Sequence, residues 1–261
     1  MVTRVMPSDR DLRALAGIVT QERPNLAEAG LPFSLLSDLA AQIACDYVLF
    51  EGYDTERQTY WFAQQVPDDY YQEPDSASDK GSHRALWEHF WDCRFCSYPD
   101  RTGDLRSVFQ VTDFYSVREW HSTGMYSDVA QPQGFEHLME VVLPEPPGPE
   151  AGPGRVARLF LVRGPGTEFS ERDRALLTLL RPHLHQAYLD AERRRHPVPD
   201  LTPRQWELMR LIAAGRTNIQ IARQLGLSEG TVRTHLENIY GRLDVSNRTA
   251  AVMRAFPEKI A

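Results

Sequence analysis

Residues 215–243 read GRTNIQIARQLGLSEGTVRTHLENIYGRL, and this stretch decides how the C-terminal end of the chain folds. Thr217 is followed three residues later by Gln220, a pair that can start a helix because each side chain bonds the other's backbone N–H. Gly226 predicts the end of that helix, and Ser228 predicts the start of another. Two helices joined by a short turn that contains glycine are typical of a helix-turn-helix.

The second of these two helices has chemically different sides. Four apolar residues recur at helical spacing and predict a buried stripe: Val232, Leu236, Ile239 and Leu243. Arg233, Thr234 and Glu237 then point to the opposite side. Arginine can pair with guanine, glutamate can accept from cytosine, and the threonine methyl can touch thymine in a major groove. The same spacing also fits a plain helical bundle with a solvated polar face.

The sequence predicts two more helices around this pair. Thr202 and Gln205 repeat the helix-starting pair, with Pro203 at the first helical position. Ser246 or Asn247 begins a last helix. We therefore expect an all-α four-helix domain over residues 201–261, preceded by a proline-rich linker over residues 196–200.

The individual residues add a family resemblance that covers about a quarter of the chain. The matching run is Leu201-Thr202-Pro203-Arg204, Glu207, Gly215-Arg216-Thr217-Asn218, Ile221-Ala222, Leu225, Ser228, Thr231-Val232-Arg233-Thr234-His235, Ile239-Tyr240, Leu243, Val245 and Arg248-Thr249-Ala250-Ala251. It closely resembles the LuxR/GerE-type helix-turn-helix family of transcription regulators. Two residues depart from the pattern: Gln205 stands where the family usually has glutamate, and Glu237 is acidic where some relatives are basic.

The resemblance implies double-stranded DNA as a partner and a homodimer whose contact often lies on the fourth helix. It implies that Arg233, Thr234 and Glu237 read bases. The residues expected at phosphates or in supporting positions are Thr217, Asn218, Thr231, His235, Asn238, Arg242 and Arg248.

The charge is divided unevenly along the chain. Residues 197–261 hold nine basic and six acidic residues, a net charge of +3, which leaves −10 for residues 1–196 of the total of −7. An acidic surface repels nucleic acid, so only the C-terminal part is suited to bind it.

Residues 1–195 mix helix and strand signals. Apolar periodicity predicts helices at 9–23, 33–44, 82–91 and 170–195, and strands at 46–53, 58–66, 106–111, 135–143 and 156–163. The proline- and glycine-rich residues 143–154 are expected to join two strands of one sheet. This predicts an α+β domain that resembles GAF- or PAS-type modules in element order. We interpret it as a sensor or dimerisation domain, and a dimerisation scaffold without a ligand remains the alternative.

The last helix of this domain carries an apolar stripe near heptad spacing. Its members are Leu177, Leu180, Leu184, Tyr188 and Ala191. We interpret the stripe as the seam of a two-helix homodimer contact. The alternative is that it covers the sheet.

Aromatic residues gather between residues 106 and 134 and mark a candidate small-molecule pocket. The candidate residues are Trp61, Tyr115, Trp120, His121 and Tyr126. Ordinary core packing is the alternative. Asp75 is followed by Ser76 where an acyl-homoserine-lactone sensor would have proline, which disfavours that ligand. With Cys96-Ser97-Tyr98-Pro99 and Asp113-Phe114-Tyr115-Ser116, the chain looks most like actinobacterial-type LuxR regulators with a GAF-like front domain.

Three cysteines, Cys45, Cys93 and Cys96, are too few for a disulfide framework and suit a reducing compartment. Cys93 and Cys96 form a lone CxxC pair near His83 and His89, too few ligands for zinc, so we expect one buried and one incidental thiol. The sequence offers no signal peptide, membrane span, phosphate loop or catalytic triad. We therefore expect a cytoplasmic protein that is not an enzyme and needs no metal or cofactor.

Overall fold

The structure is a computed structural model of the chain, and it describes residues 7–21, 23, 30–72, 82–145, 154–195, 201–243 and 245–256. The described residues fall into two compact units, one that ends at Arg195 and one that begins at Leu201. The predicted linker 196–200 lies outside the described residues. No helix in the described ranges is long and apolar enough to cross a membrane.

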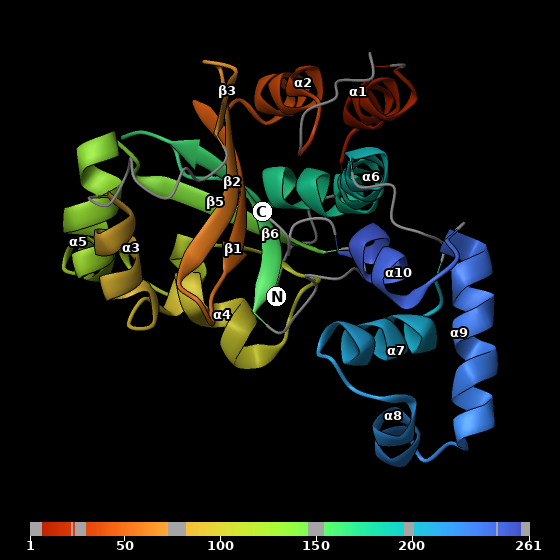
Figure 1. The fold of residues 1–261 in the computed structure, drawn as a ribbon. Coiled ribbons are helices and arrows are strands. Elements are labelled where there is room, and N and C mark those ends of the chain that lie inside the picture. The colour runs from red at the N-terminus through yellow and green to blue at the C-terminus, as the bar shows by residue number, and fades with distance from the viewer. Residues whose placement is uncertain are drawn as a thin grey trace. The chain divides into compact units, whose positions relative to one another are not determined.

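A six-stranded antiparallel sheet forms the centre of the N-terminal unit (Figure 1). Its order is β3-β2-β1-β6-β5-β4. The hairpins β1–β2 and β5–β6 are joined by the pairing of β1 with β6, in which Glu51 lies opposite Arg158. The strands are β1 (Tyr47–Asp54), β2 (Thr59–Val66), β3 (Tyr70–Gln72), β4 (Val108–Gln110), β5 (His137–Pro144) and β6 (Arg155–Arg163).

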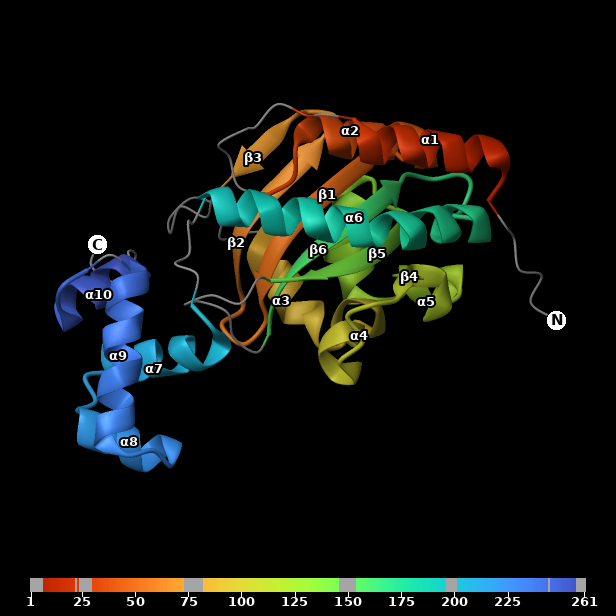
Figure 2. The same ribbon diagram turned by 90° about the vertical axis from the view of Figure 1, so that its right-hand side faces the viewer.

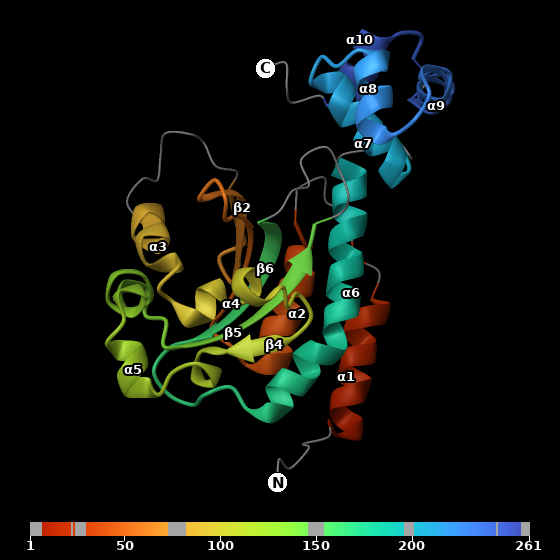
Figure 3. The same cartoon turned by 90° about the horizontal axis from the view of Figure 1, so that it is seen from below.

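Three helices cover one face of this sheet: α1 (Asp9–Thr20), α2 (Phe33–Ile43) and α6 (Glu171–Arg195). Figure 2 shows α6 crossing the sheet with α1 and α2 beside it. Their apolar sides and the sheet form one continuous core that includes Leu36, Phe50 and Leu184. The α6 helix contains Pro182 and is bent along its length (Figure 3); a proline inside a helix removes one backbone hydrogen bond and commonly bends it.

The apolar stripe of α6 is part of this core, and the predicted dimer seam is wrong. Leu177, Leu180, Leu184, Tyr188 and Ala191 are all buried within the unit itself. Tyr188, for example, meets the ring of Phe50 edge-on at a centroid distance of 5.2 Å. One stripe cannot cover the sheet and face a second copy at the same time. The alternative interpretation, that the stripe covers the sheet, is therefore correct.

Shorter helices cover the other face: α3 (Ser82–Phe90), α4 (Arg94–Thr102) and α5 (Val117–His121). A single turn, η1 (Val111–Asp113), lies between β4 and α5 along the chain, and two more, η2 (Tyr126–Ala130) and η3 (Gln131–Gln133), lie between α5 and β5. A second core, rich in aromatic rings, includes Phe95, Phe109 and Trp120. The sequence predicted the sheet and the longer helices, but not β3, α4, α5 or these turns.

Four helices form the C-terminal unit, as predicted: α7 (Pro203–Ala213), α8 (Asn218–Leu225), α9 (Glu229–Leu243) and α10 (Arg248–Ala255). Both predicted capping pairs form, Thr202 with Gln205 and Thr217 with Gln220. Asn247 caps α10 through a 2.8 Å bond from the Ala250 N–H to its Oδ1. Gly226 ends α8 with φ of 67°, a conformation that favours glycine and turns the chain toward α9.

Candidate functional site

The buried side of α9 fixes which of its residues face outward. Val232, Leu236, Ile239 and Leu243 are buried in a core shared with α7 and α8, which confirms the predicted stripe. This core also contains Trp206, which meets Phe256 edge-on at 5.9 Å. The opposite side of α9 is therefore left at the surface of the unit.

Arg233, Thr234 and Glu237 lie exposed on that opposite side. The Thr234 hydroxyl donates to the carbonyl oxygen of Gly230 at 3.2 Å, so it is engaged within the helix. Arg233 and Glu237 are one helical turn apart and share a face. The three side chains thus form one polar patch that projects from the penultimate helix.

Residues at the starts of α8 and α9 are engaged in capping. The Thr217 N–H donates to the Gln220 side-chain oxygen at 2.9 Å. The Thr231 N–H donates to the Ser228 hydroxyl at 3.1 Å, and the two hydroxyls lie 2.8 Å apart. Both helix starts lie at the surface, where first-turn N–H groups can meet an anion.

The two arginines among the predicted phosphate residues also bond within the unit. Arg248 donates to the Asn218 Oδ1 at 3.4 Å and to backbone oxygens of Ile212 and Arg216. Arg242 donates to the Gln205 side-chain oxygen at 3.3 Å. Of the remaining candidates, Asn238 is exposed and His235 is half-buried.

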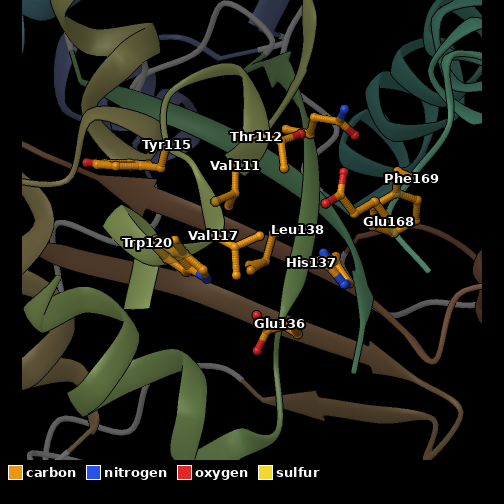
Figure 4. A pocket seen from close by; sticks show the side chains of 11 residues that line it. Val111, Thr112, Tyr115, Val117, Trp120, Glu136, His137, Leu138, Glu168 and Phe169 are labelled. Atoms are coloured by element: carbon orange, nitrogen blue, oxygen red, sulfur yellow. The ribbon is translucent and has the colours of Figure 1, made fainter. Parts of the chain in front are cut away.

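A pocket lies on the N-terminal unit between η1, α5, β5 and the residues before α6 (Figure 4). Tyr115 and Trp120 line it, together with Val117, Glu136 and Leu138. Trp120 is 2 % exposed, and its Nε1 has no hydrogen-bond partner among the described residues. Within the described ranges, Trp120 thus brings a buried indole N–H without a partner to the wall of a pocket that apolar and polar side chains line together.

His121 and Tyr126 do not line the pocket but support one of its walls. Their rings stack at 4.3 Å, and both side chains bond to Glu136, at 2.5 Å from His121 and 2.9 Å from Tyr126. Burial would raise the pKa of Glu136, but these two partners outweigh it and hold that pKa below its usual value. Glu136 is thus kept as a carboxylate at the pocket.

Trp61 does not lie with the other four candidate residues. The β1–β2 register pairs Gly52 with Phe62 and Tyr53 with Tyr60, so Trp61 is the extra residue of a bulge. Its ring packs over Gly52, where an added Cβ would lie 2.3 Å from Trp61 Cε2, and joins the core beneath α2 and α6. Periodicity cannot reveal a bulge, which moves one side chain to the other face.

A buried ionic cluster, missed by the sequence reasoning, lies between the sheet and α4. Arg158 is 1 % exposed and Glu140 is fully buried. The Arg158 guanidinium bonds to Glu140 at 3.2 Å, to Asp100 at 2.5 Å and to the Cys96 carbonyl at 2.7 Å. Burial raises the pKa of Glu140 to about 8. The sequence did contain a signal for this cluster: a charged residue in the interior of each of two apolar strands, Arg158 in RVARLFLVR and Glu140 in HLMEVVLP.

The structure does not bring the CxxC pair and the neighbouring histidines together as metal ligands. His89 instead bonds through Nε2 to Asp128 at 2.8 Å, and the side chain of His83 lies outside the described residues. Across the ranges given above, no group of three or more His, Cys, Asp or Glu side chains is placed to hold a metal ion.

A short helix, a turn closed by glycine and a second helix with an exposed polar side define the C-terminal unit as a helix-turn-helix domain. Residues 199–255 match the family of bacterial regulatory proteins named luxR family (GerE). The C-terminal unit is therefore a helix-turn-helix domain of the LuxR/GerE family.

Two curated relatives are similar over this end of the chain. A probable transcriptional regulatory protein, SgaR of Hyphomicrobium methylovorum, is 43 % identical over 79 residues, 30 % of this chain and 37 % of the relative. A putative regulator, YhjB of Escherichia coli (strain K12), is 51 % identical over 56 residues, 22 % of this chain and 28 % of the relative. The matches thus span well under half the length of these relatives.

Among solved structures, Escherichia coli SdiA is similar to the chain with a TM-score of 0.41 and 17 % identity, over 97 % of this chain and 98 % of that one.

Proposed function

We propose that the protein is a transcription regulator that binds specific sequences of double-stranded DNA and inserts α9 into the major groove. The observation that carries this proposal is the exposed patch of Arg233, Thr234 and Glu237 opposite the buried stripe of α9. These side chains can pair with guanine, touch thymine and accept from cytosine, respectively. The patch lies within the segment that matches the luxR family.

Phosphate contacts fix the position of such a helix on DNA. We assign them to the exposed starts of α8 and α9, at Thr217 and Thr231, and to Asn238. Arg248, Arg242 and Asn218 act as supports, because their bonds tie the helices to one another. His235, half-buried on the flank of α9, takes a supporting place as well.

The test uses an operator selected in vitro from random DNA with the full-length protein. Arg233→Ala is expected to weaken binding to that operator by ~1–3 kcal/mol and to relax preference at one base pair. Arg254→Ala removes an exposed arginine on another helix and serves as the matched control. Unchanged affinity and base preference in Arg233→Ala would show that this face does not read DNA.

The protein is proposed to act as a homodimer, since two recognition helices on one face read a palindromic site. The interface uses a surface other than the buried stripe of α6. Sedimentation of the full-length protein with and without a palindromic operator tests this. A single copy bound per palindrome at saturation would contradict it.

The N-terminal unit is proposed to sense a small molecule or a partner through the pocket in Figure 4. Trp120 Nε1 provides a donor, so the recognised group carries a hydrogen-bond acceptor beside an apolar body. Native mass spectrometry of the full-length protein purified from its host tests this, with Trp120→Phe as the variant that keeps an aromatic ring but removes the N–H. A protein that carries nothing and binds DNA unchanged would favour a dimerisation scaffold. We further propose that the protein acts in the cytoplasm as a regulator and not as an enzyme.

A further inference from the structure

The two cysteines at the start of α4 lie in an arrangement that the DNA-binding role does not use. Cys93 is the N-cap of α4 and Cys96 is three residues further on. At this spacing the N-cap side chain can accept the backbone N–H of the third helical residue, as in one half of a capping box. The Cys96 N–H donates to the Cys93 sulfur at 3.4 Å, and neither cysteine is in a disulfide.

From this geometry we propose that Cys93 and Cys96 form a redox pair that peroxides oxidise to an intramolecular disulfide. The two cysteines lie on the first turn of one helix and their side chains hydrogen-bond to each other, so formation of a disulfide requires little backbone movement. CxxC pairs at helix starts are favourable sites for a reactive thiolate, because first-turn N–H groups stabilise negative charge.

The surroundings distinguish the roles of the two sulfurs. Hydrogen bonds from the Cys96 thiol and from nearby backbone N–H groups lower the pKa of Cys93 below its usual value. Donation of that hydrogen bond, together with burial, raises the pKa of Cys96 well above its usual value. Cys93 also holds the N-cap position, where its sulfur accepts a first-turn N–H, so we assign Cys93 as the attacking thiolate and Cys96 as the resolving thiol.

Two arginines lie close to the pair. The Arg94 N–H donates to the Tyr115 hydroxyl at 2.6 Å, and its guanidinium lies 4.3 Å from the centroid of the Tyr115 ring. The Arg158 guanidinium donates to the Cys96 carbonyl at 2.7 Å. The positive charge of Arg158 favours a thiolate on Cys96, but burial and the hydrogen bond with Cys93 outweigh it and leave Cys96 as a thiol.

The oxidant must be small, because Cys93 is only 2 % exposed while Cys96 is half-buried. This favours hydrogen peroxide over a bulky disulfide such as oxidised glutathione. The Cys93 thiol releases its proton, its thiolate attacks one peroxide oxygen, and the O–O bond breaks. The departing hydroxide takes up the released proton as water, which leaves a sulfenic acid on Cys93. The Cys96 thiol then attacks the Cys93 sulfur, the S–S bond forms, the S–O bond breaks, and the hydroxyl leaves with the thiol proton as water. Two thiols lose two electrons, and one peroxide becomes two waters.

The third cysteine supplies an internal control. Burial raises the pKa of Cys45 to about 12, so it stays a thiol at neutral pH. Under the same dose of peroxide, Cys93 is expected to react at least about tenfold faster than Cys45.

The experiment treats the reduced full-length protein with hydrogen peroxide, blocks the remaining thiols by alkylation, and digests without reductant. Trypsin cuts after Arg84, Arg94 and Arg101, so a Cys93–Cys96 disulfide joins peptides 85–94 and 95–101 with the loss of two hydrogens. We expect this linked pair in chains that are not cross-linked to one another. The linked pair should disappear on treatment with dithiothreitol, and it should form much more slowly with oxidised glutathione. In Cys96→Ser, dimedone should label Cys93, whereas Cys45→Ser should form the linked pair as before. Two alkylated peptides after treatment, or disulfides only between chains, would overturn the proposal.

Discussion

Arg248 at the start of α10 donates from Nη1 to the Oδ1 of Asn218 at the start of α8, at 3.4 Å. A second nitrogen of the same guanidinium donates to the carbonyl oxygen of Arg216, just before α8. One side chain thus connects the last helix of the domain with the helix that precedes the recognition helix.

Replacing Arg248 should lower the stability of the C-terminal unit. We expect Arg248→Ala to reduce its free energy of unfolding by about 1–3 kcal/mol, because three acceptors lose a charged donor. Arg248→Lys should recover only part of this lost stability, since an ammonium group lacks the planar, forked set of N–H donors of a guanidinium. Thermal unfolding of the full-length protein measures this, with Arg254→Ala as control. If the melting temperature of Arg248→Ala is unchanged and its DNA binding depends less on salt, by about one released ion, Arg248 instead contacts a phosphate.

The buried cluster around Arg158 should respond asymmetrically to substitution. Arg158→Met leaves the largely buried carboxylate of Asp100 without its guanidinium and should cost about 3–5 kcal/mol in urea unfolding. Glu140→Gln should cost much less at neutral pH, because a carboxyl with a pKa of about 8 is already largely protonated there. Equal costs for the two substitutions would mean that Glu140 is ionised in the folded protein.

The same carboxyl predicts a pH dependence of stability. Its pKa in the folded protein is about 8, raised by burial from 4.5, so the folded chain holds a proton that the unfolded chain releases. Its stabilising contribution is complete below pH 4.5 and is lost as the pH rises through about 8, with a slope on the order of 1 kcal/mol per pH unit.

Urea unfolding of the wild type and of Glu140→Gln, from about pH 5 to about pH 8, isolates this slope. Glu88→Gln, at an exposed position on α3, is the matched control and should keep the wild-type slope. Parallel curves for the wild type and Glu140→Gln would exclude Glu140 as the titrating group.

Two neighbouring leucines on α6 test the role of its apolar stripe. Leu180 is 1 % exposed and Leu179 is 52 % exposed. Leu180→Ala should cost about 2–5 kcal/mol, because it opens a cavity against the sheet, whereas Leu179→Ala should cost little. Chemical unfolding measures both. A change of oligomeric state without a loss of stability in Leu180→Ala would restore the dimer-seam interpretation.

The recognition helix could be predicted from sequence because its signals are local. Thr217, Gln220 and Gly226 act on their own turns, and Val232 and Leu236 recur at the helical period. The sheet strands were predictable for the same reason. The hydrogen bond of Arg248 with Asn218 could not be predicted, because the two residues lie thirty positions apart in the sequence.

The N-terminal site could not be predicted from sequence patterns. The bulge at Trp61 moves its ring to the α2 and α6 face, and no periodic pattern records such an insertion. The short helices α4 and α5 are too brief for a periodic signal, yet α4 brings Cys93 and Cys96 together and α5 places Trp120 in the pocket wall. The sequence offered charged residues inside apolar strands, Arg158 and Glu140, whose pairing only the β5–β6 register establishes.

The pairing of Glu51 on β1 with Arg158 on β6 also affects how the chain reaches its folded state. The centre of the sheet cannot form until the ribosome has synthesised β6. The β1 edge of the first hairpin therefore stays unpaired while about a hundred further residues are added. Contacts of such long range make folding slow and expose that edge to other chains. The C-terminal helices, each started by its own cap and packed on near neighbours, are expected to fold orders of magnitude faster once they emerge.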